Sequence, residues 1–173
     1  MRYSEIDLCE CCNGLDVGMS LYIQGCSRHC KGCFNQETWD FNGGKPFVED
    51  QIEYILKELN RPYIHRLTIL GGEPLENINM LDLCVLIECV KTTKPEIKIW
   101  LYTGYTYEHL LQKMMYSPTP FLDYILRNID ILVDGEFIEE EKDLTYPFAG
   151  SINQRIIDLK SSRETGEIVL LSL

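Results

Sequence analysis

Short apolar segments alternate along this chain with longer segments in which apolar residues recur every three or four positions. Side chains alternate with period 2 along a strand and with period 3.6 along a helix, so the short segments predict strands and the longer ones predict helices. The predicted strands are residues 19–24, 67–70, 97–102 and 129–133. The predicted helices are residues 48–59, 80–91, 107–115 and 121–126. Residues 1–16 predict a loop with a turn at Asn13-Gly14.

The order of these elements, strand then helix repeated along the chain, predicts parallel β/α units. A closed barrel of eight such units typically needs about 250 residues, and this chain has 173. We therefore expect an α/β fold in which parallel strands form a partial, open (β/α) barrel. Residues 1–173 are expected to form a single domain, with a C-terminal extension from about residue 150.

The predicted helix over residues 80–91 has apolar residues on most sides, so we expect it to be well buried. Cys84 and Cys89 lie on it and point about 140° away from each other, given about 100° per helical residue. They cannot easily share a metal ion. Both are expected to pack in the core as small apolar side chains.

The chain is acidic, because 27 Asp and Glu residues outnumber 16 Lys and Arg residues and give a net charge of −11. It contains no basic run, so nucleic-acid binding is not expected, and a macromolecular partner is expected to be a protein. No apolar run approaches the length that spans a membrane, and the N-terminal residues lack the apolar core of a signal peptide. These features predict a soluble, cytoplasmic protein.

Eight cysteines in a reducing compartment indicate metal binding or catalysis rather than disulfides. Three of them, Cys26, Cys30 and Cys33, have the spacing C-x3-C-x2-C in a loop over residues 25–35, directly after the first predicted strand. Thiolates so close together indicate a metal centre. Structural zinc requires four ligands, so three thiolates indicate a centre with one open position. A four-iron, four-sulfur cluster with one free iron is such a centre.

The other predicted strands also end in unusual residues, at Gly71-Gly72-Glu73-Pro74, Thr103-Gly104-Tyr105 and Asp134-Gly135-Glu136. Ligands of parallel β/α proteins bind beyond the C-terminal ends of the strands, so all these residues are expected on one rim. Gly71 and Gly72 lack side chains, and a small molecule can lie against bare backbone there. Taken singly, Thr103 and Asp134 are better explained as cap or turn residues than as ligand-binding residues.

Cys9, Cys11 and Cys12 allow two interpretations. They form either a second metal site or a group of reduced thiols near the first site, and the C-x-C-C spacing favours the second, because neighbouring side chains diverge. His29 lies between two of the predicted ligands, and its spacing favours a solvent-facing loop residue over a fourth ligand.

The C-x3-C-x2-C motif with Phe34 after its last cysteine, together with Gly71-Gly72-Glu73-Pro74, resembles the radical S-adenosylmethionine enzymes. Further segments resemble one family of glycyl-radical enzyme activases, the activating proteins of anaerobic ribonucleoside-triphosphate reductases. These segments are Asn13-Gly14, Gly25–Asn35, Thr38-Trp39, Tyr102–Tyr105, Asp134–Phe137 and Gly150–Arg155. The resemblance covers nearly the whole chain. Cys9, Cys11, Cys12 and the chain after Arg155 depart from it.

The resemblance implies a partial barrel of the radical S-adenosylmethionine type, with a [4Fe-4S] cluster held by Cys26, Cys30 and Cys33. It implies that S-adenosylmethionine binds at Gly32, Cys33, Phe34, Gly71, Gly72, Glu73, Pro74, Thr103 and Asp134. It further implies that a reduced flavodoxin-like donor supplies an electron for cleavage of S-adenosylmethionine, and that the resulting 5′-deoxyadenosyl radical takes hydrogen from a glycine of the reductase. No catalytic side chain beyond the cluster and S-adenosylmethionine is expected.

Two other functions remain open from the sequence. One is a radical S-adenosylmethionine enzyme that acts on a small molecule. The other is a non-catalytic zinc or iron–sulfur binding module, in which His29 or Cys12 completes the ligand set.

Overall fold

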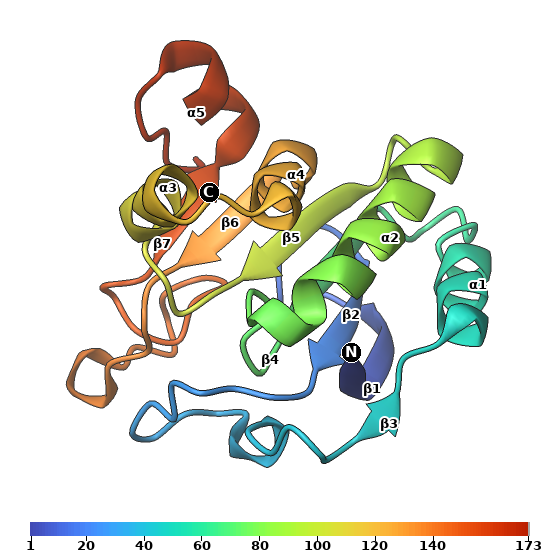
Figure 1. The fold of residues 1–173 in the computed structure, drawn as a ribbon, viewed down its shortest axis with the longest axis horizontal. Helices are drawn as coiled ribbons and strands as arrows, with labels where there is room; N and C mark the ends of the chain where they lie inside the picture. The colour runs from blue at the N-terminus through green and yellow to red at the C-terminus, as the bar shows by residue number, and fades with distance from the viewer. Residues whose placement is uncertain (173) are drawn as a thin grey trace.

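The computed structural model describes residues 1–172, in which seven strands form one mixed sheet in the order β3-β1-β2-β4-β5-β6-β7 (Figure 1). The strands are β1 Arg2–Glu10, β2 Gly18–Ile23, β3 Lys45–Pro46, β4 Arg66–Gly71, β5 Lys98–Tyr102, β6 Ile131–Asp134 and β7 Arg155–Asp158. The α-helices are α1 Glu49–Glu58, α2 Asn77–Thr93, α3 Tyr107–Tyr116, α4 Pro120–Asn128 and α5 Leu159–Thr165. Two short 3₁₀ helices, η1 Gln36–Thr38 and η2 Glu139–Glu141, lie in the loops.

Side chains at the helix starts explain where three of the helices begin. The Thr106 hydroxyl accepts a hydrogen bond from the backbone N–H of His109 at the start of α3, and Thr119 does the same for Leu122 at the start of α4. Pro120 occupies the first turn of α4, where its missing N–H costs nothing. Asp158 caps α5 by accepting from the N–H of Ser161.

The central strands confirm the β/α order expected from the sequence, because β2, β4, β5 and β6 are parallel. The expectation of parallel strands alone is wrong at both edges. Strand β1 pairs with β2 and with β3 in antiparallel fashion, and β7 is antiparallel to β6. The sheet is therefore mixed, with a parallel centre and antiparallel edges.

The prediction of a loop over residues 1–16 is wrong for its first part, which forms β1. The apolar residues of this strand, Tyr3, Ile6 and Leu8, all belong to or pack against the main core. Their spacing is not the regular two residues, because the register shifts between Tyr3 and Glu5. A β-bulge adds one residue to a strand and breaks the alternation that identifies it in a sequence.

Helix α2 is buried on one side only, which corrects the expectation that it is buried nearly all round. Ile78, Leu81 and Val85 are 65%, 55% and 45% exposed, although each is apolar. Cys84 and Cys89 are half-buried rather than fully enclosed, and Cys84 packs against the main core.

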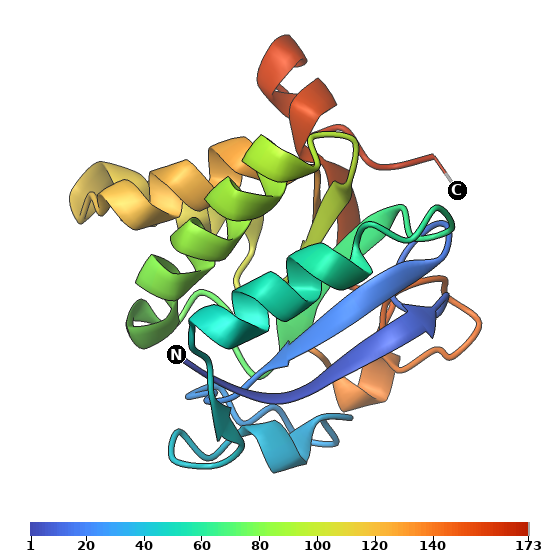
Figure 2. The ribbon, with the colours of Figure 1, turned by 90° about the vertical axis from the view of Figure 1, so that its right-hand side faces the viewer.

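The two faces of the sheet differ in what covers them. Leu21, Ile69 and Leu101 face the helices and join α1 to α4 in the main core, which Figures 1 and 2 show as a layer of helices along one side of the sheet. Arg66 and Trp100 are buried on the other face, where the described residues form a smaller apolar cluster around Trp100 and Val133. That second face and the C-terminal rim of the parallel strands hold the candidate site. No helix within residues 1–172 has the length and apolar character needed to cross a membrane.

Candidate active site

A cavity of about 380 Å³ lies at the C-terminal ends of the four parallel strands. Each strand end supplies a residue to its lining: Cys26 after β2, Gly72 after β4, Thr103 after β5 and Gly135 after β6. Figure 1 shows the loop after β2 and the segment after β6 at the same end of the sheet. The structure thus brings together the four strand ends that the sequence singled out. The volume is within the range of small-molecule sites.

The loop over residues 25–35 is fixed to the segment that follows it. The N–H of Gly25 donates to the carbonyl of Thr38 at 2.7 Å, and the N–H of Cys26 donates to the carbonyl of Trp39 at 3.1 Å. His29 is exposed and has a positive φ of 50°. Its ring stacks on that of Trp39 with centroids 4.6 Å apart, so it lies on the loop surface as expected.

All three motif cysteines border the cavity, and backbone N–H groups lie near their sulfurs. Burial raises the pKa of the Cys26 and Cys30 thiols, and the N–H groups of Arg28 and His29 at Cys26 and of Phe137 at Cys30 act in the opposite direction. The sulfur of Cys33 accepts from the N–H of Asn35 at 3.4 Å. Such N–H donors stabilise thiolate ligands and tune the clusters that they hold. The donor set therefore fits an iron–sulfur cluster.

Burial has the larger effect on the Cys26 and Cys30 thiols, so the pKa of both is raised. A thiolate here needs a positive partner, and a metal centre supplies one. Within residues 1–172, no three His, Cys, Asp or Glu side chains converge on one point as ligands of a single metal ion do. Cluster ligation does not require such convergence, because each thiolate binds a different iron.

Gly71 and Gly72 are required by the packing of two backbones. Gly71 has a φ of +108°, which favours glycine. A Cβ on Gly72 would lie 2.4 Å from the carbonyl oxygen of Gly25, the residue before Cys26. The N–H of Glu73 also donates to that carbonyl at 2.9 Å. The end of β4 therefore packs directly against the start of the cysteine loop, and both glycines line the cavity.

The carboxylate of Glu73 joins the ends of β4 and β5. It is almost fully buried and accepts hydrogen bonds from the Thr103 hydroxyl at 2.8 Å and the Gly104 N–H at 2.9 Å. The N–H of Leu75 donates to the same carboxylate at 3.0 Å. Burial nevertheless raises the pKa of Glu73 above its ordinary value. The side chains of Glu73 and Thr103 thus brace two strand ends against each other at the cavity wall.

Of the other predicted site residues, one lines the cavity and three do not. Phe34 lines the cavity and is 51% exposed, whereas Gly32, Pro74 and Asp134 are not among the described residues that line it. The Asp134 carboxylate is fully buried and accepts from the N–H of Tyr107 at 2.7 Å and from Arg155. Asp134 therefore holds the start of α3 and the start of β7 behind the rim.

Arg28 and Gln154 are among the cavity residues that were not predicted from the sequence. Arg28 lies inside the cysteine motif, and a cation between thiolate ligands is the signal that could have identified it. Gln154 belongs to the segment Gly150–Arg155, and its side chain accepts from the N–H of Gly150 at 2.8 Å and donates to the carbonyl of Gly135 at 3.0 Å. Gln154 thereby attaches this segment to the end of β6.

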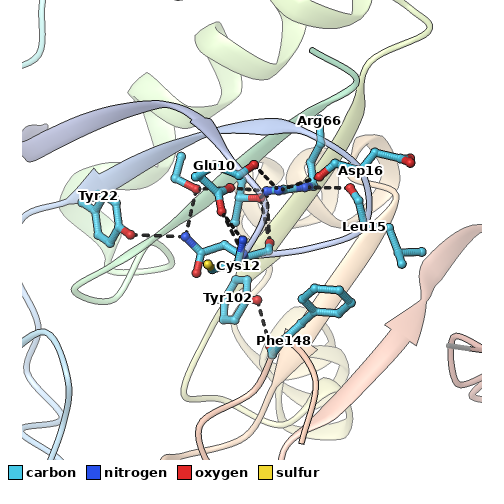
Figure 3. Close-up of polar contacts among 11 residues, drawn as sticks. Glu10, Cys12, Leu15, Asp16, Tyr22, Arg66, Tyr102 and Phe148 are labelled. Carbon is cyan, nitrogen blue, oxygen red and sulfur yellow. Dashed lines mark hydrogen bonds and ion pairs between the residues drawn. The ribbon is translucent and has the colours of Figure 1, made fainter. Parts of the chain in front are cut away.

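A buried ion pair lies beside Cys12, which is one of the residues that line the same cavity (Figure 3). Arg66 contacts the Glu10 carboxylate at 2.6 Å and donates to the carbonyls of Leu15 and Asn13 at 3.0 and 3.2 Å. Glu10 in turn accepts from the N–H groups of Cys12 and Asn13. Burial opposes its charge, but hydrogen bonds from Arg66 and Ser20 outweigh burial and lower the pKa of Glu10. Cys9, Cys11 and Cys12 are all exposed.

Comparison with known proteins is consistent with this geometry. A family described as a 4Fe-4S single cluster domain matches residues 12–157. The fold and the three-thiol cavity thus define a protein of the iron–sulfur cluster class.

Curated relatives narrow this class to one family. An anaerobic ribonucleoside-triphosphate reductase-activating protein of Vibrio cholerae is 35% identical over 90% of this chain and 97% of its own length. Proteins with the same name are 34% identical in Enterobacteria phage T4, over 90% of this chain and 93% of the relative, and 32% identical in Salmonella typhi, over 92% and 100%. The chain belongs to the family of anaerobic ribonucleoside-triphosphate reductase-activating proteins, which confirms the resemblance seen in its motifs.

Proposed function

We propose that this chain activates an anaerobic ribonucleoside-triphosphate reductase by radical chemistry. A [4Fe-4S] cluster held by Cys26, Cys30 and Cys33 would supply one electron for the cleavage of S-adenosylmethionine to methionine and a 5′-deoxyadenosyl radical. That radical would take hydrogen from a glycine of the reductase, which gives 5′-deoxyadenosine and a glycyl radical. The observation that carries the proposal is the cavity in which Cys26, Cys30 and Cys33 meet the ends of four parallel strands.

Three side chains are proposed to hold the cluster, namely those of Cys26, Cys30 and Cys33. Their shared cavity and the backbone N–H groups near their sulfurs support this assignment. The proposed contacts of S-adenosylmethionine are Gly32, Cys33, Phe34, Gly71, Gly72, Glu73, Pro74, Thr103 and Asp134. The residues of this set that line the cavity are proposed to touch S-adenosylmethionine. Asp134 is proposed to act by holding the rim in place.

The protein residues orient the reactants and exclude water, which is the main contribution of a protein to cofactor chemistry. Glu73 and Thr103 fix the spacing of two strand ends through a buried hydrogen bond of 2.8 Å. Trp39 and Tyr102 supply apolar surface to the cavity wall. The side chains of Trp39 and Tyr102 thereby reduce the amount of water that reaches the reacting groups.

A protein substrate requires a wide entrance, and two features support one. Among the described residues the sheet ends at two separate edge strands, β3 and β7, and this openness supports the proposal of a partial barrel of the radical S-adenosylmethionine type. Phe34 is half-exposed at the cavity, with its ring 5.2 Å from that of Phe137. A loop of the reductase that carries the glycine is proposed to enter between these segments.

The proposed partners are the reductase and a reduced flavodoxin-like electron donor. The net charge of −11 suits a basic surface around the target glycine. Binding through that surface would weaken as salt is raised, since exposed charges are screened. Affinity for the reductase that does not change with salt would contradict this part of the proposal.

The test is to mix the reconstituted protein anaerobically with reductase, reductant and S-adenosylmethionine, and to record the electron paramagnetic resonance spectrum of the reductase. We expect a glycyl radical signal with the parent protein and with Cys84→Ala, whose thiol lies on α2 outside the cavity. We expect no signal with Cys30→Ala. A radical product on a small molecule without reductase, or one bound zinc ion and no sulfide, would overturn the proposal.

A further inference from the structure

Arg28 is the one basic side chain among the described residues that line the cavity, and it comes from within the cysteine motif. Its side chain is 20% exposed, and its guanidinium lies 4.7 Å from the centre of the Tyr105 ring. It also packs flat on Gly104, where an added Cβ would lie 2.2 Å from Nε. Arg28 therefore joins the cysteine loop to the end of β5.

Glu136 provides the second half of this contact. Its carboxylate lies 2.9 Å from the guanidinium of Arg28. Burial and, after it, the charge of this carboxylate raise the pKa of the Cys30 thiol, which places Glu136 close to that sulfur. A negative charge and its positive partner thus lie together beside one of the proposed cluster ligands.

We propose that Arg28 and Glu136 form a charge pair that sets the reduction potential of the cluster and positions the cysteine loop on the rim. This inference rests on the cluster assigned under the proposed function. Reduction adds one negative charge to the cluster, so a nearby cation favours reduction and a nearby anion opposes it. In the parent protein the two charges largely cancel.

The physical consequence is a pair of opposite effects. Arg28→Gln leaves Glu136 without its partner beside Cys30 and makes the cluster harder to reduce. Glu136→Gln leaves Arg28 without its partner and makes the cluster easier to reduce. At a fixed solution potential, each change should alter the ratio of reduced to oxidised cluster by roughly tenfold, given Coulomb energies at a partly buried site. The double variant should lie near the parent protein.

A second ion pair in the same loop provides a matched control. Lys31 follows Cys30 directly, and its ammonium lies 2.8 Å from the Glu139 carboxylate. Like the pair of Arg28 and Glu136, this ion pair joins a basic residue of the cysteine loop to an acidic residue beyond β6. The Lys31 side chain is 78% exposed, and solvent screens charges at such a position. Lys31→Gln should therefore shift the potential by much less than Arg28→Gln does.

The experiment is an anaerobic redox titration of the reconstituted full-length protein, followed by electron paramagnetic resonance of the reduced cluster. Iron and sulfide content is measured first on every variant, so that only samples with a full cluster are compared. Arg28→Lys retains the charge and should recover most of the parent potential. Opposite shifts for Arg28→Gln and Glu136→Gln, with a small shift for Lys31→Gln, are the expected result.

A role for the pair in structure alone predicts something different. Loosening of the loop would lower the cluster content of both variants, and would not move their potentials in opposite directions. Potentials that shift in the same direction, or that stay at the parent value in fully loaded variants, would overturn the inference. Failure of the parent protein to take up any cluster would instead overturn the proposed function, so the two failures are distinguishable.

Discussion

The guanidinium of Arg66 lies 2.6 Å from the carboxylate of Glu10, and both side chains are almost completely excluded from solvent, at 1% and 8% exposure. The pair ties β4 to the last residue of β1, and Arg66 also donates to the carbonyl of Leu15 in the loop that follows β1 (Figure 3). Because Arg66 also satisfies backbone carbonyls of that loop, its removal leaves a buried charge and several buried acceptors without partners.

We therefore expect Arg66→Met to lower the free energy of unfolding by about 3–5 kcal/mol, the usual cost of breaking one side of a buried pair. Urea unfolding checks this value. Arg127→Met is the control, because Arg127 forms an exposed pair with Asp123 one helical turn away, and its loss should cost less than about 1 kcal/mol. Equal losses of unfolding free energy in Arg66→Met and Arg127→Met would show that the buried pair stabilises the fold no more than the exposed pair does.

Gly72→Ala should disturb the cluster site through backbone contact. The added methyl group would meet the carbonyl oxygen of Gly25 at 2.4 Å and push the cysteine loop away from β4. We expect a loss of about 1–3 kcal/mol in unfolding free energy, the cost of overpacking, together with reduced iron and sulfide uptake. Gly166→Ala is the control for cluster uptake: Gly166, unlike Gly72, has a positive φ of 75°, but nothing lies within 4 Å of an added Cβ. Unchanged cluster uptake in Gly72→Ala would contradict the close packing of the two loops.

Acid should weaken the attachment of α3 to β7. Hydrogen bonding from Arg155 lowers the pKa of Glu108 from 4.5 to about 2. A carboxyl whose pKa is lower in the folded state stabilises the fold above its unfolded pKa, and that stability is lost as the pH falls from about 4.5 through about 2. Thermal unfolding between pH 6 and pH 3 should therefore show a shallower acid dependence for Glu108→Gln than for the parent. Parallel curves for the two proteins would rule out this linkage.

Cys12 is expected to be dispensable for the cluster, although it lines the same cavity. Cys12 is exposed, whereas Cys26 is buried and Cys30 and Cys33 are half-buried. Cys12→Ser should hold as much iron and sulfide as the parent protein, and Cys26→Ser should lose most of both. Metal and sulfide analysis after reconstitution measures this. Loss of the cluster in Cys12→Ser would make Cys12 a fourth ligand.

The sequence predicts the centre of this fold better than its edges, for physical reasons. Strands β2, β4, β5 and β6 are buried at the centre of the sheet and bear continuous apolar segments, which a pattern search finds. Strand β1 is interrupted by bulges and β3 has only two residues, so neither shows a clear period. The exposed side of α2 was missed because Ile78, Leu81 and Val85 are apolar, and pattern alone does not say which apolar residues lack a neighbour.

The candidate site also has a part that the sequence predicts and a part that it does not. The cysteine motif and the strand-end glycines are local in sequence, and the parallel order of strands predicts that they meet on one rim. Arg28 and Glu136 are 108 residues apart, and no spacing rule connects them. The internal role of Glu73 likewise depends on Thr103, which only the register of β4 beside β5 brings within reach.

The most direct test of the account is to assay 5′-deoxyadenosine after anaerobic reconstitution, reduction and addition of S-adenosylmethionine. The account predicts product with the parent protein and with Cys84→Ala, and none with Cys26→Ala, Cys30→Ala or Cys33→Ala. Absence of product from a parent protein shown to carry a reducible cluster, both alone and with the reductase present, would contradict the central claim.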